Sequence, residues 1–145
     1  MRVSQKIHID REPADVFKLI GDLPQHPEFL VGTVWKPVSN QTHGVGARYR
    51  VLMKIGSVQV GGIVEVIRWE DDALIEWSAV QGVHQTIRWL LSPTDDGGTE
   101  LQIEVDYDIG GGFIGGLVER IAARTIARNL WASLMAARRL VEQDV

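Results

Sequence analysis

The C-terminal segment places the strongest constraint on what this chain can fold into. Residues 113–143 contain no proline, and their only glycines are Gly115 and Gly116 near the start. The segment is rich in alanine, leucine and arginine, which are good helix formers. A continuous helix over this range spans roughly 45 Å at 1.5 Å per residue. A helix that long in a chain of 145 residues needs something broad to pack across.

The two sides of this predicted helix differ in polarity. Arg120, Arg124 and Arg128 recur at intervals of four residues, with Arg138 near the same side. We expect this side to be solvated, although it also suits an anionic membrane surface, and we expect the opposite side to be buried. Small residues on the buried side either let a sheet approach closely or leave space. That side carries Val118, Ala122, Ile126, Leu130, Ser133 and Ala137.

The rest of the chain supplies the broad surface as a series of predicted strands. Short turns containing Gly, Pro or Asp separate most of them, which indicates an antiparallel meander. The expected fold class is therefore α+β, with a curved antiparallel sheet of about seven strands packed on the long helix in one domain, residues 1–145. The predicted strands cover residues 3–9, 33–39, 47–54, 58–69, 73–80, 84–92 and 99–109.

Two short helices are expected after the first strand. Pro13 suits a first helical position, because its missing N–H costs nothing there, and Gly21 ends that helix. Pro24 and Pro27 then limit the following segment to a short second turn of helix.

Alternation along the strands predicts which side chains face inward. In the last strand Leu101, Ile103, Val105, Tyr107 and Ile109 alternate with acidic residues and a glutamine. The same logic places Glu76 and Ser78 outside. It places inside the sheet residues Ala47, Tyr49, Val51, Met53, Val60, Gly62, Val64, Val66, Ile75, Trp77, Ala79, Gln85, Ile87, Trp89 and Leu91.

This interior combines large rings that have polar tips with the amides of Gln85 and Asn129. Buried amides, hydroxyls and ring N–H groups are costly unless they are hydrogen-bonded. The polar groups therefore either satisfy one another inside a solid core or line a cavity that orients a ligand.

Composition removes several classes of function. A formal charge of −4 and a pI near 5.5 argue against nucleic-acid binding. No stretch approaches the roughly 18–20 apolar residues of a spanning helix, and residues 1–10 lack the apolar block of a signal peptide, so we expect a cytoplasmic protein. The absence of cysteine excludes disulfides and thiolate chemistry.

No cofactor or metal site is predicted. Residues 110–115 match G-x-G-x-x-G, but no second strand follows the helix, so we interpret the glycines as a strand-to-helix turn and a flexible edge of the cavity. His8, His26, His43 and His84 show no metal-ligand spacing. We expect surface or turn positions for them, apart from His84, which begins a strand near the predicted interior.

The order of elements and several local motifs resemble a known family. Residues 7–17, with the sequence IHIDREPADVF, resemble the opening of START-like domains in the polyketide cyclase/dehydratase and lipid-transport branch. Residues 22–29 resemble that family's proline-containing second helix, with Phe29 where the family often has Trp. Residues 44–49 resemble its glycine turn into the third strand, and the resemblance covers essentially the whole chain.

The resemblance implies a helix-grip fold, in which a seven-stranded antiparallel sheet grips the long helix around a hydrophobic tunnel. Members bind lipids, sterols, polyketides, quinones or plant hormones, and some are enzymes. The resemblance carries no universal catalytic motif, so it assigns no catalytic residue here.

The first functional hypothesis is binding, transport or sequestration of a small hydrophobic or amphipathic ligand, such as a lipid, quinone or polyketide-like molecule. The ligand would lie between the sheet and the long helix, with Tyr107, Gln85 and Asn129 orienting its polar end. The expected contact residues are Phe29, Tyr49, Val51, Val64, Trp77, Gln85, Ile87, Trp89, Val105, Tyr107, Val118, Ala122, Ile126 and Asn129.

Two alternatives remain open. A cyclase or dehydratase enzyme would use the same cavity and needs an acid/base pair, for which His84 with Tyr107 or Tyr49 is the candidate set. A protein-interaction module would use the outer face of the sheet, or Trp35 and Trp69, to contact a partner. The sequence specifies neither the ligand nor the oligomeric state.

Overall fold

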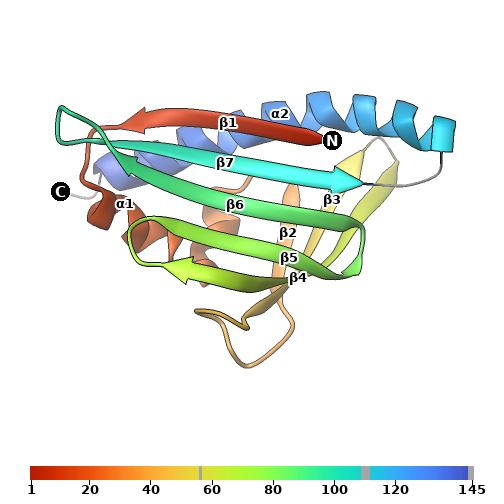
Figure 1. Cartoon of the computed structure of the whole chain (residues 1–145), viewed down its shortest axis with the longest axis horizontal. Helices are drawn as coiled ribbons and strands as arrows, with labels where there is room; N and C mark the ends of the chain where they lie inside the picture. The colour runs from red at the N-terminus through yellow and green to blue at the C-terminus, as the bar shows by residue number, and fades with distance from the viewer. Residues whose placement is uncertain (56, 109–111, 144–145) are drawn as a thin grey trace.

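The computed structural model describes the chain except for residues 56, 109–111 and 144–145. It confirms the α+β class, with a curled antiparallel sheet and a long C-terminal helix (Figure 1). Two predictions fall partly outside the described residues, namely the inward-facing Ile109 at the end of the last strand and the flexible cavity edge at Gly110 and Gly111. The elements are β1 (Arg2–Ile9), α1 (Pro13–Ile20), the 3₁₀ helix η1 (Leu23–Glu28), β2 (Thr33–Pro37), β3 (Arg48–Ile55), β4 (Val58–Glu70), β5 (Leu74–Gly82), β6 (His84–Pro93), β7 (Thr99–Asp108) and α2 (Gly112–Gln143).

All seven strands form one antiparallel sheet in the order β1-β7-β6-β5-β4-β3-β2. Register shifts between Ile63 and Val64 and between Val66 and Arg68 interrupt the β4–β5 pairing. Such bulges bend a strand and increase its twist. In Figure 1 the sheet accordingly curls, with β2 and β3 turned away from the plane of β6 and β7.

Glycines make the sharpest part of this curl possible. A Cβ at Gly62 would lie 2.0 Å from the Gln81 carbonyl oxygen, and one at Gly61 would lie 1.9 Å from the Val51 carbonyl oxygen. Gly82, at φ +88°, approaches the same place from β5. Because no side chain fits between these backbones, β3, β4 and β5 can approach closely only at glycine.

One end of the interior is filled by aromatic rings. Trp35 and Trp77 meet edge to face with centroids 5.1 Å apart, and Tyr49 lies 5.6 Å from Trp77. Phe29 and Trp89 form a second such pair at 6.0 Å. Edge-to-face contacts are the preferred geometry for aromatic pairs, so this cluster is a packed core.

His26 lies inside this ring cluster, so its predicted surface or turn position is wrong. It is fully buried, and its Nε2–H donates to the Ile20 carbonyl oxygen at 2.9 Å. Its Nδ1 has no hydrogen-bond partner among the described residues. Burial lowers the pKa of His26 to about 4, so the ring is neutral at pH 7. Spacing rules missed it because η1 folds back over the end of the sheet, which no local pattern reveals.

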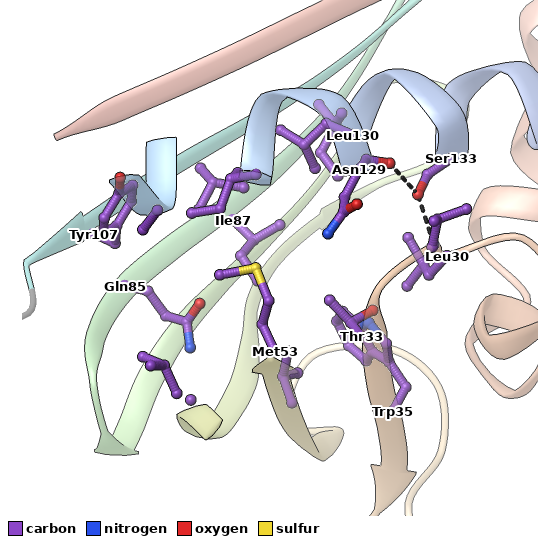
Figure 2. Close-up of a pocket in the computed structure, with 18 of the residues that line it drawn as sticks. Leu30, Thr33, Trp35, Met53, Gln85, Ile87, Tyr107, Asn129, Leu130 and Ser133 are labelled. Carbon is purple, nitrogen blue, oxygen red and sulfur yellow. Dashed lines mark hydrogen bonds between the residues drawn. The ribbon is translucent and has the colours of Figure 1, made fainter. Parts of the chain in front are cut away.

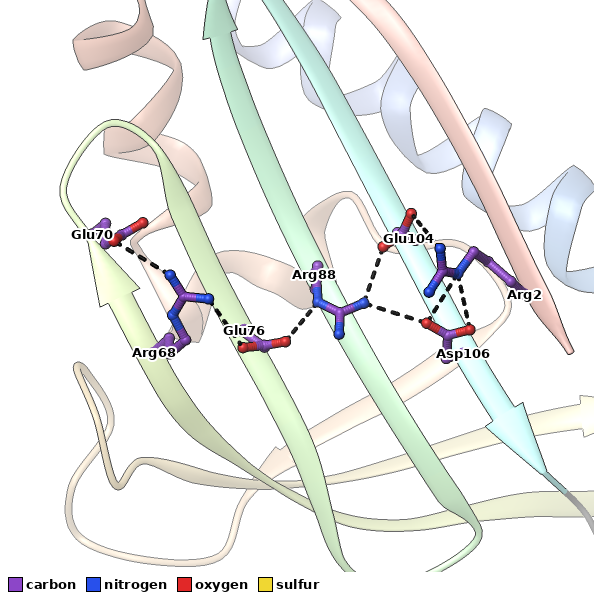
Figure 3. A network of polar contacts seen from close by, with 7 residues as sticks. All are labelled: Arg2, Arg68, Glu70, Glu76, Arg88, Glu104 and Asp106. Carbon is purple, nitrogen blue, oxygen red and sulfur yellow. Dashed lines mark hydrogen bonds and ion pairs between the residues drawn. The ribbon is translucent and has the colours of Figure 1, made fainter.

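The outer face of the sheet carries a chain of ion pairs (Figure 3). Arg88 contacts Glu76 at 2.6 Å, Glu104 at 3.0 Å and Asp106 at 3.3 Å. Arg2 continues the chain at 3.0 Å from Asp106. Glu76 is on the predicted outer face, but it is only 7% exposed because Arg68 and Arg88 flank it.

Replacing His26 should alter stability in one pH window. With an unfolded pKa near 6.5 and a folded pKa of about 4, the unfolded chain takes up a proton first as the pH falls. The free energy of unfolding should therefore drop by about 3 kcal/mol between pH 6.5 and pH 4. Urea unfolding of His26→Leu should lack this drop, whereas exposed His84→Gln should keep it. An unchanged pH slope in His26→Leu would contradict this assignment.

Replacing Arg88 should lower the free energy of unfolding more than replacing an unpaired arginine on the same face of the sheet. Arg88→Leu leaves Glu76, Glu104 and Asp106 without the cation that they share. This substitution should lower the free energy of unfolding by roughly 2 kcal/mol. Arg50→Leu is the matched control, because Arg50 is exposed and has no ion pair with any described residue. Equal urea midpoints for the two variants would show that the network contributes nothing to stability.

Candidate functional site

A cavity of about 90 Å³ lies between α2 and the sheet (Figure 2). It borders the ring cluster, because Trp35 of that cluster lines it. Its wall is mainly apolar and comes from α2, the loop after η1, Val83 and five of the strands, β2, β3, β4, β6 and β7. Ala122 and Ser133 line it, so these small residues of α2 leave space here, whereas Ala137 is buried without lining it. The lining residues are Leu30, Val31, Thr33, Trp35, Val51, Met53, Val60, Gly61, Val83, Gln85, Ile87, Ile103, Val105, Tyr107, Ala122, Ile126, Asn129, Leu130 and Ser133.

The structure brings many of the sequence-predicted contact residues to this cavity. They come from the sheet and from α2, which are far apart in the sequence and meet because α2 crosses the sheet. The predicted residues that line the cavity are Val51, Gln85, Ile87, Val105, Tyr107, Ala122, Ile126 and Asn129.

The other predicted contact residues do not line it. Phe29, Tyr49, Val64, Trp77 and Trp89 are buried in the packed core, most of them as members of the ring cluster. Val118 is half-buried and lies outside the lining. Alternation along a strand identifies the inward face, but it does not tell which part of that face meets packed rings and which part meets space.

Sequence reasoning missed part of the wall and misplaced one residue. Trp35 was expected as a surface contact for a partner, yet it is 7% exposed and lines the cavity. Trp69 is half-buried and packs edge-on against Phe17 at 5.5 Å. Leu30 and Val31 also line the cavity, but a loop has no periodicity that could have identified them.

Hydrogen bonds already occupy the hydroxyl groups of Tyr107 and Ser133. The Tyr107 hydroxyl donates to the Glu119 carbonyl oxygen at 2.7 Å, and burial raises the pKa of Tyr107, so the phenol stays protonated. The Ser133 Oγ–H donates to the Asn129 carbonyl oxygen at 2.7 Å, and Ser133 Oγ accepts from the Val31 N–H at 2.8 Å. The Val31 bond ties the loop after η1 to α2 (Figure 2).

Three other polar side chains of the wall have no such partners. The amides of Gln85 and Asn129 are partly buried and form no hydrogen bond with any described residue. Thr33 Oγ1 is buried without a partner among the described residues. Gln85 comes from β6, Asn129 from α2 and Thr33 from β2. Hydrogen-bonding groups from three elements therefore face the same space.

The candidate acid/base set is not brought together. His84 is exposed and alternates along β6 with inward-facing Gln85. The Tyr49 hydroxyl donates to the Thr42 carbonyl oxygen at 3.2 Å, and Tyr49 does not line the cavity. In the described part of the chain, no three His, Asp or Glu side chains gather as metal ligands.

The solvated side of α2 is as predicted. Arg120, Arg124 and Arg128 are exposed, and Arg138 is partly exposed. No helix over the described ranges has both the length and the apolar character that a bilayer crossing requires.

Comparison with known proteins identifies the family of this chain. A family model described as polyketide cyclase/dehydrase and lipid transport matches residues 1–142. No curated protein matches the chain in sequence.

Solved structures share the fold along almost the whole chain. TTHA0849 from Thermus thermophilus has a TM-score of 0.82 at 19% identity, over 99% of this chain and 98% of that chain. The Zhui aromatase/cyclase from Streptomyces sp. R1128 has a TM-score of 0.81 at 13% identity, over 99% and 94%. A START superfamily protein from Mycobacterium smegmatis has a TM-score of 0.70 at 19% identity, over 99% of both chains.

Removing the Ser133 hydroxyl should loosen the loop after η1. Ser133→Ala leaves the Val31 N–H without its acceptor. The free energy of unfolding should therefore fall by about 1 kcal/mol. The Val31 amide should then exchange with solvent deuterium faster, as measured by NMR, while amides of the ring cluster stay protected. Exposed Ser92→Ala is the control. Unchanged exchange at Val31 in Ser133→Ala would show that this bond does not hold the loop.

Proposed function

Because the chain belongs to the polyketide cyclase/dehydrase and lipid transport family, we propose that it binds a small hydrophobic or amphipathic molecule in the cavity between α2 and the sheet. One observation carries the proposal: an apolar cavity whose wall also holds unpaired polar side chains. Apolar walls with a few convergent polar groups are typical of small-molecule sites.

Apolar burial would supply most of the affinity. Burying about 200 Å² of ligand carbon is worth roughly 5 kcal/mol before the costs of association. The proposed contacts are the predicted residues that line the cavity, namely Val51, Gln85, Ile87, Val105, Tyr107, Ala122, Ile126 and Asn129.

Met53 would allow the cavity to adapt to a larger ligand. Its side chain reaches into the space near Gln85 and Asn129 (Figure 2). Methionine has an unbranched, flexible side chain that adapts to irregular gaps. Movement of Met53 would enlarge the cavity without a change in the backbone.

Binding is favoured over catalysis in the same cavity. A cyclase or dehydratase mechanism needs a positioned acid and base. The lining contains no Asp, Glu, His, Lys or Arg among the described residues, and the Tyr107 hydroxyl is already bonded to Glu119. No observation at this site favours the enzymatic alternative.

Ligand binding should appear as thermal stabilisation that depends on the cavity. A fatty alcohol, a naphthoquinone and a hydroxyanthraquinone serve as probes for lipid, quinone and polyketide-like ligands. A probe that binds should raise the free energy of unfolding by about 2.7 kcal/mol at 100 times its Kd. Native mass spectrometry of protein purified from its host should also show retained small-molecule mass.

A cavity-filling variant tests the location. Ala122→Leu adds bulk to the wall and should weaken binding of an active probe at least about tenfold. Ala132→Leu is the matched control, since Ala132 is on α2 but does not line the cavity. The proposal fails if no probe shifts the melting temperature, or if both variants bind equally well.

A further inference from the structure

The described wall of the cavity offers no opposite charge to a charged ligand group. Among the described lining residues there is no Lys, Arg or His to meet an anion, and no Asp or Glu to meet a cation. The arginines of α2 at 120, 124 and 128 are exposed on its other side. A buried charge that no opposite charge compensates costs several kcal/mol, so a carboxylate or phosphate inside this cavity would be strongly disfavoured even beside neutral donors.

The same wall is not suited to a pure hydrocarbon either. Gln85, Asn129 and Thr33 present amide and hydroxyl groups that have no hydrogen bond with any described residue. A hydrocarbon that displaced water from them would leave these groups unpaired, and an unpaired buried polar group costs free energy. A ligand that carries an oxygen at this point removes that cost.

The Asn129 amide is held in place by the loop after η1. Gly32 has φ +77°, and a Cβ there would lie 2.2 Å from Asn129 Nδ2, so the amide packs directly on the glycine backbone. The bond from the Val31 N–H to Ser133 fixes the same loop one helical turn along α2. The amide is therefore positioned before a ligand arrives, which lowers the entropic cost of recognition.

We infer that the ligand is an uncharged molecule with a hydrogen-bonding oxygen, such as a ketone, an alcohol or a phenol. This inference rests on the proposed function and narrows it. Gln85 and Asn129 are the specificity-determining residues, with Thr33 as a third contact. An amide both donates and accepts, so either a carbonyl or a hydroxyl oxygen can be matched. Fatty acids and other anions are excluded by the same wall.

Three probes with the same ring system and different polar groups test this in the unchanged protein. They are naphthalene, 2-acetylnaphthalene and 2-naphthoate, titrated by calorimetry at pH 7.5. The neutral ketone should bind about threefold to tenfold more tightly than naphthalene, the range of one net hydrogen bond. The carboxylate should bind at least about a hundredfold more weakly than the ketone.

Variants then assign the preference to the amides. Gln85→Leu and Asn129→Leu, singly and together, should reduce the preference for the ketone over naphthalene to about one. Binding of naphthalene itself should be retained or improved. Gln81→Leu is the matched control, because Gln81 is an exposed amide on β5 that does not line the cavity. If the double variant does not fold, the comparison of the three probes in the unchanged protein still tests whether the cavity prefers an uncharged ligand with an oxygen.

The outcomes separate this inference from the function on which it rests. Equal binding of ketone and carboxylate, or of ketone and naphthalene, would overturn the inference and leave the proposed function standing. Failure of all three probes to bind would count against the proposed function and would overturn the inference with it. A preference for the ketone that survives loss of both amides would also overturn the assignment to Gln85 and Asn129.

Discussion

The packing of α2 across the concave face of the sheet is the constraint on which the other features depend. Close to one end of α2, Leu134 and Ala137 join the core that contains the large rings of Trp77 and Trp89. Nearer the start of the helix Ala122 has little side-chain volume, and so does Ser133 where the filled part begins beside Leu134; both line the cavity. Because helix and sheet are stiff elements, they cannot close on small residues at one place while large rings fill the core elsewhere, and space remains.

The backbone around this space is arranged to close it on two sides. The close approach of β3, β4 and β5 at Gly61, Gly62 and Gly82 curls the sheet, and it brings Gly61 into the wall. On the other side the bond between Val31 and Ser133 fastens the loop after η1 to α2. The bond to Val31 uses the Ser133 hydroxyl, and the Tyr107 hydroxyl is bonded to the Glu119 carbonyl oxygen of α2. The Gln85 and Asn129 amides remain for recognition, and that is why we assign specificity to them.

Much of the architecture was predictable from the sequence, because it follows from repeating patterns. The proline-free C-terminal segment predicted α2, and alternation such as that from Leu101 to Tyr107 predicted the inward face of β7. The sequence patterns did not predict where along a strand the packed core ends and the cavity begins, or where a loop places its residues. Alternation gave Trp77 and Gln85 the same status, although one packs in the ring cluster and the other faces space. Buried His26 and the lining residue Val31 depend on how η1 and its loop fold back, and no period encodes that.

The central claim is that the interior space is where a small molecule binds, and NMR contacts between a bound molecule and individual methyl groups test it most directly. With 2-acetylnaphthalene bound to methyl-labelled protein, intermolecular nuclear Overhauser effects should appear to Ile87, Val105 and Ile126, which line the cavity. They should be absent from exposed Ile67 and Ile121. Contacts to Ile121 on the outer side of α2, without contacts to the cavity methyls, would contradict the account.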